Sequence, residues 1–167
     1  LINRIYGYFG NKRATLGDTD ITRSITLTGQ AVIKESNKII TKYVQDLVGL
    51  SDKERIEHNP IIYNDTDSLY ITIKDILDKK DMPLLNRNHR ISKQVKGEVQ
   101  KIEDHLNTEI TTWAKRALNT NDSRFVFKRE SICDVGMFLQ KKRYVLHILD
   151  DEGLPVDKFK YTGVEVV

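Results

Sequence analysis

The chain has 167 residues, of which 39% are hydrophobic and 31% charged, and its 27 basic and 24 acidic residues give a net charge of +3. This length suits one domain, and the small positive charge permits a nucleic-acid partner without arguing for one. A single cysteine excludes a disulfide framework, and no second cysteine is available for a zinc site. No apolar run approaches the ~18 residues of a membrane span and no basic-then-apolar leader is visible, so we expect neither a membrane partner nor secretion.

Two segments carry the pattern of long helices. From Asp18 onward, apolar residues recur at three- and four-residue steps, which is the spacing of one helix face. Asp18 stands where this helix begins and can cap it, and Gly49 can end it. A second apolar stripe predicts another long helix over residues 91–117.

The remaining segments favour strands. In residues 61–73, strand formers flank a short polar stretch, which predicts a β-hairpin with Asp65 and Asp67 at its tip. The last third is expected to contain strands at residues 125–127, 132–139 and 144–149, a turn at residues 150–153, and a closing strand from Phe159. Because helices and strands do not alternate regularly, the predicted fold is α+β, with an antiparallel sheet and two long helices packed on one face.

The predicted hairpin places two carboxylates close together. Asp65 and Asp67 are two residues apart, so an extended backbone points both to one side. With the hydroxyl oxygens of Thr66 and Ser68 nearby, they would suit a hard cation such as Mg²⁺. The alternative is ordinary turn chemistry without a metal, because aspartates are common in turns. The spacing of the residues leaves both interpretations open.

Several segments resemble motifs of family B DNA polymerases, and they occur in the expected order. Residues 63–68 (Tyr-Asn-Asp-Thr-Asp-Ser) resemble the family's Tyr-Gly-Asp-Thr-Asp-Ser motif, with Asn64 in place of Gly. Residues 3–7 (Asn-Arg-Ile-Tyr-Gly) resemble the end of its Asn-Ser-x-Tyr-Gly fingers-helix motif, with Arg4 in place of Ser. Residues 141–144 (Lys-Lys-Arg-Tyr) resemble the motif that tracks the new duplex.

Three shorter similarities extend this resemblance along the chain. Arg129-Glu130 is similar to the Arg-Glu pair that precedes the last motif, and residues 160–165 are similar to the stretch where palm passes to thumb. Residues 26–30 (Thr-Leu-Thr-Gly-Gln) resemble the replicative polymerases of tailed phages.

The resemblance implies a polymerase palm over residues 18–160. Residues 1–17 would be the end of the fingers helix and the return to the palm, and residues 161–167 the start of the palm-to-thumb connection. The family's first palm motif has no counterpart in this chain, so the sheet is expected to lack one strand. Because the chain also opens without Met, we expect it to be part of a longer polymerase whose N-terminal part is supplied by the same or a separate chain.

The implied activity is template-directed transfer of dNMP to a primer 3′-hydroxyl in DNA replication, with two Mg²⁺ ions about 3.5–4 Å apart. Asp67 matches the family's essential metal ligand, and Asp65 matches the neighbouring carboxylate. Glu130 would be an accessory carboxylate on a strand; its alternative role is an ion pair with Arg129 or Lys128. The other essential Asp belongs to the missing motif, so the isolated chain is expected to be inactive.

The resemblance also implies binding residues and partners. Asn3, Tyr6 and Gly7 would form part of the nucleotide pocket. Lys142 would reach the DNA from a strand in the same sheet as the Asp65 hairpin, together with its neighbours in the motif, Lys141, Arg143 and Tyr144. The implied partners are primer–template DNA, dNTP and the missing N-terminal part, with a sliding clamp as a further candidate. The expected compartment is the cytoplasm of a host cell, if the chain is phage-encoded.

A non-catalytic nucleic-acid-binding module with a palm-like shape is the alternative function. Such a module would keep the basic Lys-Lys-Arg run without any chemistry. The presence of both Asp65 and Asp67 favours the enzyme.

Overall fold

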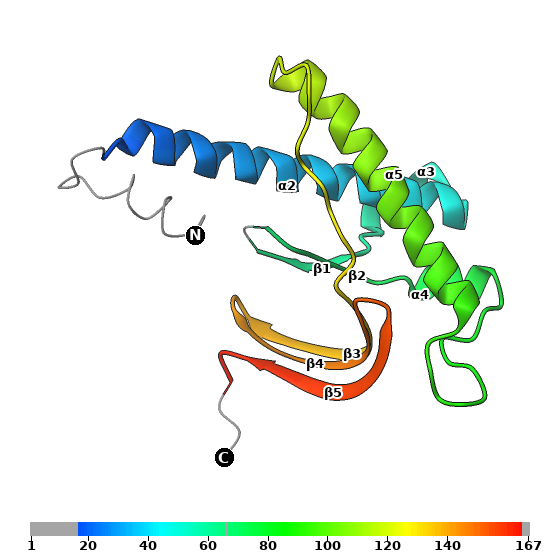
Figure 1. The fold of residues 1–167 in the computed structure, drawn as a ribbon. Coiled ribbons are helices and arrows are strands. Elements are labelled where there is room, and N and C mark those ends of the chain that lie inside the picture. The colour runs from blue at the N-terminus through cyan, green and yellow to red at the C-terminus, as the bar shows by residue number, and fades with distance from the viewer. Residues whose placement is uncertain (1–16, 66, 165–167) are drawn as a thin grey trace.

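The computed structural model describes residues 17–65 and 67–164. The predictions for Asn3, Tyr6 and Gly7 therefore lie outside the described residues. In chain order, the elements are α2 (Thr19–Val48), α3 (Asp52–Glu57), β1 (Ile61–Asn64), β2 (Leu69–Ile71), α4 (Lys74–Lys79), α5 (Lys93–Ala117), β3 (Ser131–Gln140), β4 (Arg143–Asp151) and β5 (Leu154–Thr162) (Figure 1). This arrangement confirms the predicted α+β class.

The two predicted long helices are present and end where the sequence indicates. The Asp18 carboxylate accepts hydrogen bonds from the backbone N–H groups of Asp20 and Ile21, at 2.8 and 3.2 Å, and so caps α2. Gly49 ends α2 in the left-handed conformation, with φ of 73°. α5 begins two residues later than predicted, because the Ser92 hydroxyl caps it by accepting from the Val95 N–H. In the described part of the chain, no helix has the length and apolar character needed to cross a membrane.

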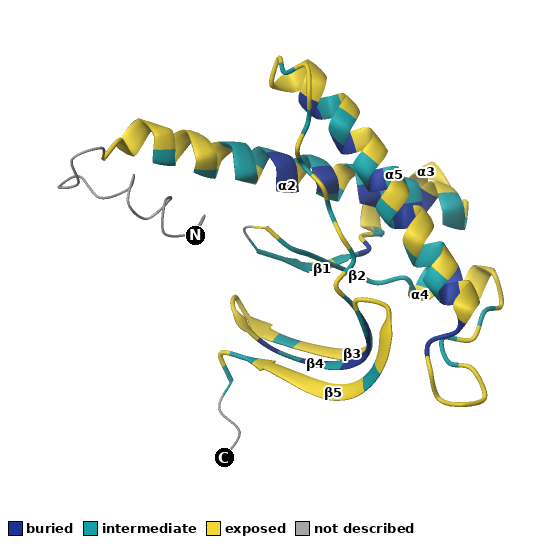
Figure 2. Ribbon diagram, viewed as in Figure 1, coloured by how far each residue is buried: buried dark blue, intermediate teal, exposed yellow. Residues whose placement is uncertain are grey.

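The β1–β2 hairpin lies between the helices and a second sheet (Figure 1). On one side, Leu69 and Ile71 of β2 pack against a core built from α2, α4 and α5, whose buried members are Ile40, Val44, Ile76, Ile102 and Leu106. On the other side, the hairpin contacts the sheet formed by β3, β4 and β5. Figure 2 shows that the buried residues concentrate where α2 crosses α5 and along β4.

The second sheet is a three-stranded antiparallel meander, in the order β3-β4-β5. The predicted turn after β4 is confirmed: Glu152 and Gly153 both have positive φ, 51° and 94°, between the paired residues Asp151 and Leu154. Two positive φ values in a two-residue loop match the twist of the flanking strands. β5 begins at Leu154, earlier than the predicted start at Phe159, because an edge strand tolerates Pro155.

Two predictions about the strands are wrong. The strands form two separate sheets and not one, since the described residues of β1–β2 share no ladder with β3–β5. Residues 125–127 form no strand, and the backbone of Phe127 bonds to an α5 side chain instead. The Asn107 amide donates to the Phe127 carbonyl at 2.8 Å, and its oxygen accepts from the Phe127 N–H at 2.7 Å. Glu103 accepts from the Arg129 N–H at 2.6 Å in the same way.

A buried carboxylate connects α5 to the second sheet. Asp150 is fully buried and forms ion pairs with Lys96 of α5 and with Arg129. It also accepts from the Gly153 N–H at 3.0 Å, which ties the β4–β5 turn to the same carboxylate. Burial by itself raises the pKa of Asp150, but Lys96 and Arg129 outweigh it and hold that pKa below its usual range.

Replacing Asp150 by Ala is expected to lower the free energy of unfolding by about 3 kcal/mol, since it leaves two cations facing a buried gap. Asp151→Ala is the matched control, because Asp151 pairs with Lys158 at the surface, with side chains 37% and 50% exposed. The control should cost less than about 1 kcal/mol in urea unfolding. Since the pKa of Asp150 is lowered on folding, its contribution is present above the unfolded pKa and lost as pH falls through the folded pKa. Equal losses in both variants would contradict this assignment.

Candidate functional site

The two aspartates lie in the turn of the β1–β2 hairpin, as predicted. Asn64 and Leu69 are the last paired residues, and the Asp65 N–H donates to the Ser68 carbonyl at 3.1 Å across the turn. Asp67 is exposed, whereas Asp65 is half-buried. Both aspartates thus lie beyond the last pair of the ladder, and Asp67 is the more exposed of the two.

Four aromatic rings join this hairpin to the second sheet. Tyr63 and Tyr70 are cross-strand partners in β1–β2, and Phe138 and Tyr144 are cross-strand partners in β3–β4. The two pairs pack against each other, and every pair of rings has centroids 5.4 to 5.8 Å apart. We call these residues the four-ring cluster. In β1, the side chain of Ile61 packs toward the helices, whereas that of Tyr63 packs toward the cluster. A register shift between these two residues accompanies this difference in direction.

The hydroxyl groups of the cluster fix the relative position of the two hairpins. The Tyr70 and Tyr144 hydroxyls are hydrogen-bonded at 2.9 Å, and the Tyr63 hydroxyl accepts from the Lys142 N–H at 3.0 Å. Burial, the Tyr144 hydroxyl and the charge of Glu130 raise the pKa of Tyr70 far above its ordinary value. The Tyr70 phenol is therefore neutral at physiological pH and remains a hydrogen-bond donor.

Lys142 lies beside the aspartate turn, although not on a strand. The prediction that it belongs to a strand in the hairpin's own sheet is wrong, because Lys142 occupies the β3–β4 turn with φ of 61°. The two sheets meet through side chains and not through a shared ladder. The Lys142 Nζ nevertheless lies 3.8 Å from Asp65 Oδ2. The four-ring cluster thus brings the tips of two separate hairpins together.

The other residues of the Lys-Lys-Arg-Tyr run have different surroundings. Lys141 and Arg143 are exposed, and the Arg143 Nε donates to the Gly163 carbonyl at 3.0 Å. Tyr144 is buried, 9% exposed, so its ring positions the turn from within the four-ring cluster. The structure therefore does not support the prediction that Tyr144 contacts DNA, because its ring is buried.

Glu130 precedes β3 and is exposed. The predicted strand position is wrong by one residue, since β3 begins at Ser131. The alternative ion pair with Arg129 or Lys128 is also wrong, because Arg129 pairs with Asp150 and Lys128 with Glu152. The negative charge of Glu130 makes a small contribution to the raised pKa of Tyr70.

The donor set at the turn suits part of a Mg²⁺ site. Carboxylate oxygens are the ligands that Mg²⁺ prefers, and it is usually bound by one or two carboxylates together with substrate phosphates. Asp65 and Asp67 supply two such groups. Within residues 17–65 and 67–164, no cluster of three or more His, Cys, Asp or Glu side chains could hold a metal. The described residues thus fit an incomplete metal site.

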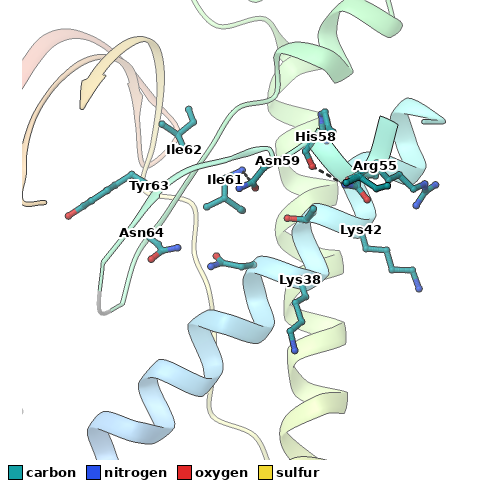
Figure 3. Close-up of a pocket in the computed structure, with 13 residues that line it drawn as sticks. Lys38, Lys42, Arg55, His58, Asn59, Ile61, Ile62, Tyr63 and Asn64 are labelled. Carbon is teal, nitrogen blue, oxygen red and sulfur yellow. Dashed lines mark hydrogen bonds between the residues drawn. The ribbon is translucent and has the colours of Figure 1, made fainter. Parts of the chain in front are cut away.

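A polar groove that the sequence did not reveal runs along β1. It has a volume of about 700 Å³ and lies between β1, α2 and α3. In Figure 3, Lys38 and Lys42 extend from α2 away from the strand, so their charges lie outside the groove. The Gln45 amide donates to the carbonyls of Arg55 and His58, at 3.0 and 2.9 Å, and holds the groove's wall. At one end the groove reaches Asn64, next to the aspartate turn.

Phe138→Ala is expected to lower the free energy of unfolding by about 2–3 kcal/mol, because it removes a half-buried ring from the four-ring cluster. It should also speed hydrogen exchange at the Lys142 amide, since that amide is held by the Tyr63 hydroxyl. Phe159→Ala is the matched control, because Phe159 is 58% exposed and lies outside the cluster. An unchanged Lys142 exchange rate in Phe138→Ala would show that the cluster does not position the β3–β4 turn.

Comparison with known proteins identifies the family. The sequence family described as DNA polymerase family B matches residues 1–167. The chain is 26% identical over 176 residues to the DNA-directed DNA polymerase of Escherichia phage RB69, a match that covers 99% of the chain and 19% of that protein. It is 28% identical over 161 residues to the DNA polymerase of Trichoplusia ni ascovirus 2c, covering 96% of the chain and 12% of that protein. The chain thus spans less than a fifth of the length of either relative. These matches confirm the resemblance found in the motifs, and the chain belongs to DNA polymerase family B, a family of nucleotidyltransferases.

Proposed function

We propose that the chain is the C-terminal part of a polymerase palm and supplies half of a metal site for template-directed transfer of dNMP to a primer 3′-hydroxyl. The observation that carries this proposal is the juxtaposition of Lys142 and Asp65, 3.8 Å apart at the tips of two hairpins. A carboxylate pair and a cation at one place match the two requirements of the reaction. One group must hold Mg²⁺, and the other must hold the DNA that brings the primer end to it.

Asp67 is the proposed principal metal ligand, because its carboxylate is exposed at the turn. Asp65 would support it from a half-buried position, where the nearby Lys142 balances its charge. When bound, Mg²⁺ would lower the pKa of the primer hydroxyl and stabilise the charge of the leaving pyrophosphate. Glu130 is proposed as an accessory carboxylate, since its position in the motif pattern matches that role and it is exposed.

Lys141, Lys142 and Arg143 are the proposed DNA contacts. All three are exposed at or next to the β3–β4 turn, and Lys142 lies beside Asp65. Contacts of lysine and arginine with phosphates give affinity that is independent of base sequence and sensitive to salt. Tyr144 contributes indirectly, because its hydroxyl bonds to Tyr70 inside the four-ring cluster and so positions the turn.

The remaining part of the polymerase is the proposed partner that completes the site. The chain spans less than a fifth of either relative, and the second essential Asp would come from the missing N-terminal part. Large apolar side chains that are half exposed on the first half of α2 and on β3 support this: Ile21, Ile25, Leu27, Val135, Met137 and Leu139. The nucleotide-pocket roles of Asn3, Tyr6 and Gly7, the domain boundaries and a sliding clamp as partner belong to the same proposal.

The 167-residue chain alone should show no primer extension with Mg²⁺ and dNTPs, because it holds only part of the metal site. Activity should appear when the N-terminal part of the polymerase is fused or added. In that complete form, Asp67→Asn is expected to lower the extension rate at least about 10²–10³-fold by removing charge that stabilises the transition state. Asp78→Asn on α4 is the control and should retain full activity. Robust extension by the isolated chain, or by Asp67→Asn, would refute the proposed site.

Lys142→Gln should weaken the binding of primer–template DNA equally across base sequences. The affinity for DNA should also depend less steeply on salt concentration. The slope of log affinity against log salt concentration should decrease in magnitude by about 0.9 for each phosphate that the variant no longer neutralises. Lys115→Gln, in the last turn of α5, removes the same charge away from the hairpin tips and serves as the control. Fluorescence anisotropy at several salt concentrations measures both quantities. If the two variants bind DNA with equally reduced affinity, Lys142 makes no particular contact with DNA.

A further inference from the structure

A histidine in the middle of the second sheet contacts an aspartate on each neighbouring strand. His147 lies on β4, paired with Val135 of β3 and Phe159 of β5. Its Nδ1 is 2.7 Å from Asp134 Oδ1 on β3, and its Nε2 is 2.8 Å from Asp157 Oδ1 on β5. The imidazole also stacks on the Phe159 ring, with centroids 4.5 Å apart and planes at 23°. This face of the sheet is opposite to the one that packs on the hairpin.

Both distances require hydrogen bonds that only one form of histidine can make. A carboxylate accepts hydrogen bonds and cannot donate them when ionised, so each ring nitrogen must carry a proton. Neutral imidazole has one N–H, whereas the imidazolium has two. The arrangement therefore calls for the charged form, with one cation shared between two anions.

We propose that protonated His147 ties the three strands of the second sheet together, and that its deprotonation loosens the edge strand β5. The reason is the geometry of the triad formed by Asp134, His147 and Asp157. When one ring proton is lost, one of the two carboxylates loses its donor, and the two carboxylates are no longer bridged by a positive charge. Asp157 is the more easily released, because its side chain is 85% exposed whereas that of Asp134 is 27% exposed.

The direction of the pKa agrees with this arrangement. The hydrogen bond with Asp157 is the largest cause that raises the pKa of His147 above its ordinary value; burial opposes it, and the hydrogen bond with Asp134 and the charges of both aspartates add to the rise. Asp134 from β3 and Asp157 from β5 are the charged groups of the described chain that act on it. Because the pKa is raised on folding, the stabilisation is complete below the unfolded pKa of about 6.5 and is lost as pH rises through the folded pKa.

The loosening of β5 would affect the opposite face of the sheet. Lys158 and Lys160 of β5 line a cavity of about 350 Å³ together with Glu130, the proposed accessory carboxylate. Loosening β5 would change the charges around Glu130, because both lysines belong to that strand. This inference rests on the His147 geometry and stands whether or not the chain takes part in nucleotidyl transfer.

Nuclear magnetic resonance of the 167-residue chain tests the proposal. Long-range ¹H–¹⁵N correlation should show both His147 nitrogens protonated at a pH of about 6.5, with a titration midpoint above that of free histidine. Asp157→Asn should move the midpoint down toward the free value. Asp151→Asn, at the end of β4, removes a carboxylate that pairs with Lys158 and not with His147, and it should leave the midpoint unchanged. A midpoint at or below about 6.5 in the unmodified chain would overturn the proposal.

Hydrogen exchange supplies the structural readout. Protection factors of β5 amides, corrected for the intrinsic effect of pH, should fall several-fold as pH rises through the His147 midpoint. In Asp157→Asn the fall should occur at lower pH, and in His147→Gln the protection should be low and independent of pH over this range. Because Asp157 is 85% exposed, Asp157→Asn should fold even if His147→Gln does not. Protection that stays constant across the midpoint in the unmodified chain would refute a role in holding β5.

Discussion

The packing of two cross-strand aromatic pairs on each other is the constraint on which the rest of the site depends. Neither hairpin shares a backbone ladder with the other in the described chain, so their relative position depends on contacts made by side chains. The four-ring cluster supplies apolar contact, and two hydroxyl-mediated hydrogen bonds supply the register between the hairpins. An aromatic cluster suits this task, because large rings bury much area with few rotatable bonds, and hydroxyls inside it must find partners.

Each hairpin is also attached to the helices. The apolar side of β1–β2 packs on a core shared by α2, α4 and α5. Asp150 anchors the far end of the second sheet to α5 through Lys96. The buried carboxylate is stable as an anion only because cations surround it, so the ion pairs and the fold depend on each other. The second sheet is thus held near the β3–β4 turn by the packing of the four-ring cluster, and at its far end by the ion pairs of Asp150.

At the hairpin tips, an exposed lysine lies beside a half-buried aspartate. Lys142 lies beside Asp65 yet remains exposed, with 66% of its side chain in solvent. Such a pair contributes little to stability, because solvent screens it and the lysine chain must be ordered. It nevertheless places a positive charge next to the Asp65 carboxylate.

The sequence by itself determined the features that depend on neighbours along the chain. The caps of α2, the β1–β2 hairpin with its two aspartates, the Glu152–Gly153 turn and the family motifs could all be predicted, because each involves residues within a few positions of one another. The tertiary structure decided what depends on distant contacts. Asn107 took the backbone bonds of Phe127, Arg129 paired with Asp150 and not Glu130, and Lys142 reached Asp65 from a turn in another sheet. Local spacing cannot show such pairings, because the chain must first fold back on itself before buried rings and charges can select their partners.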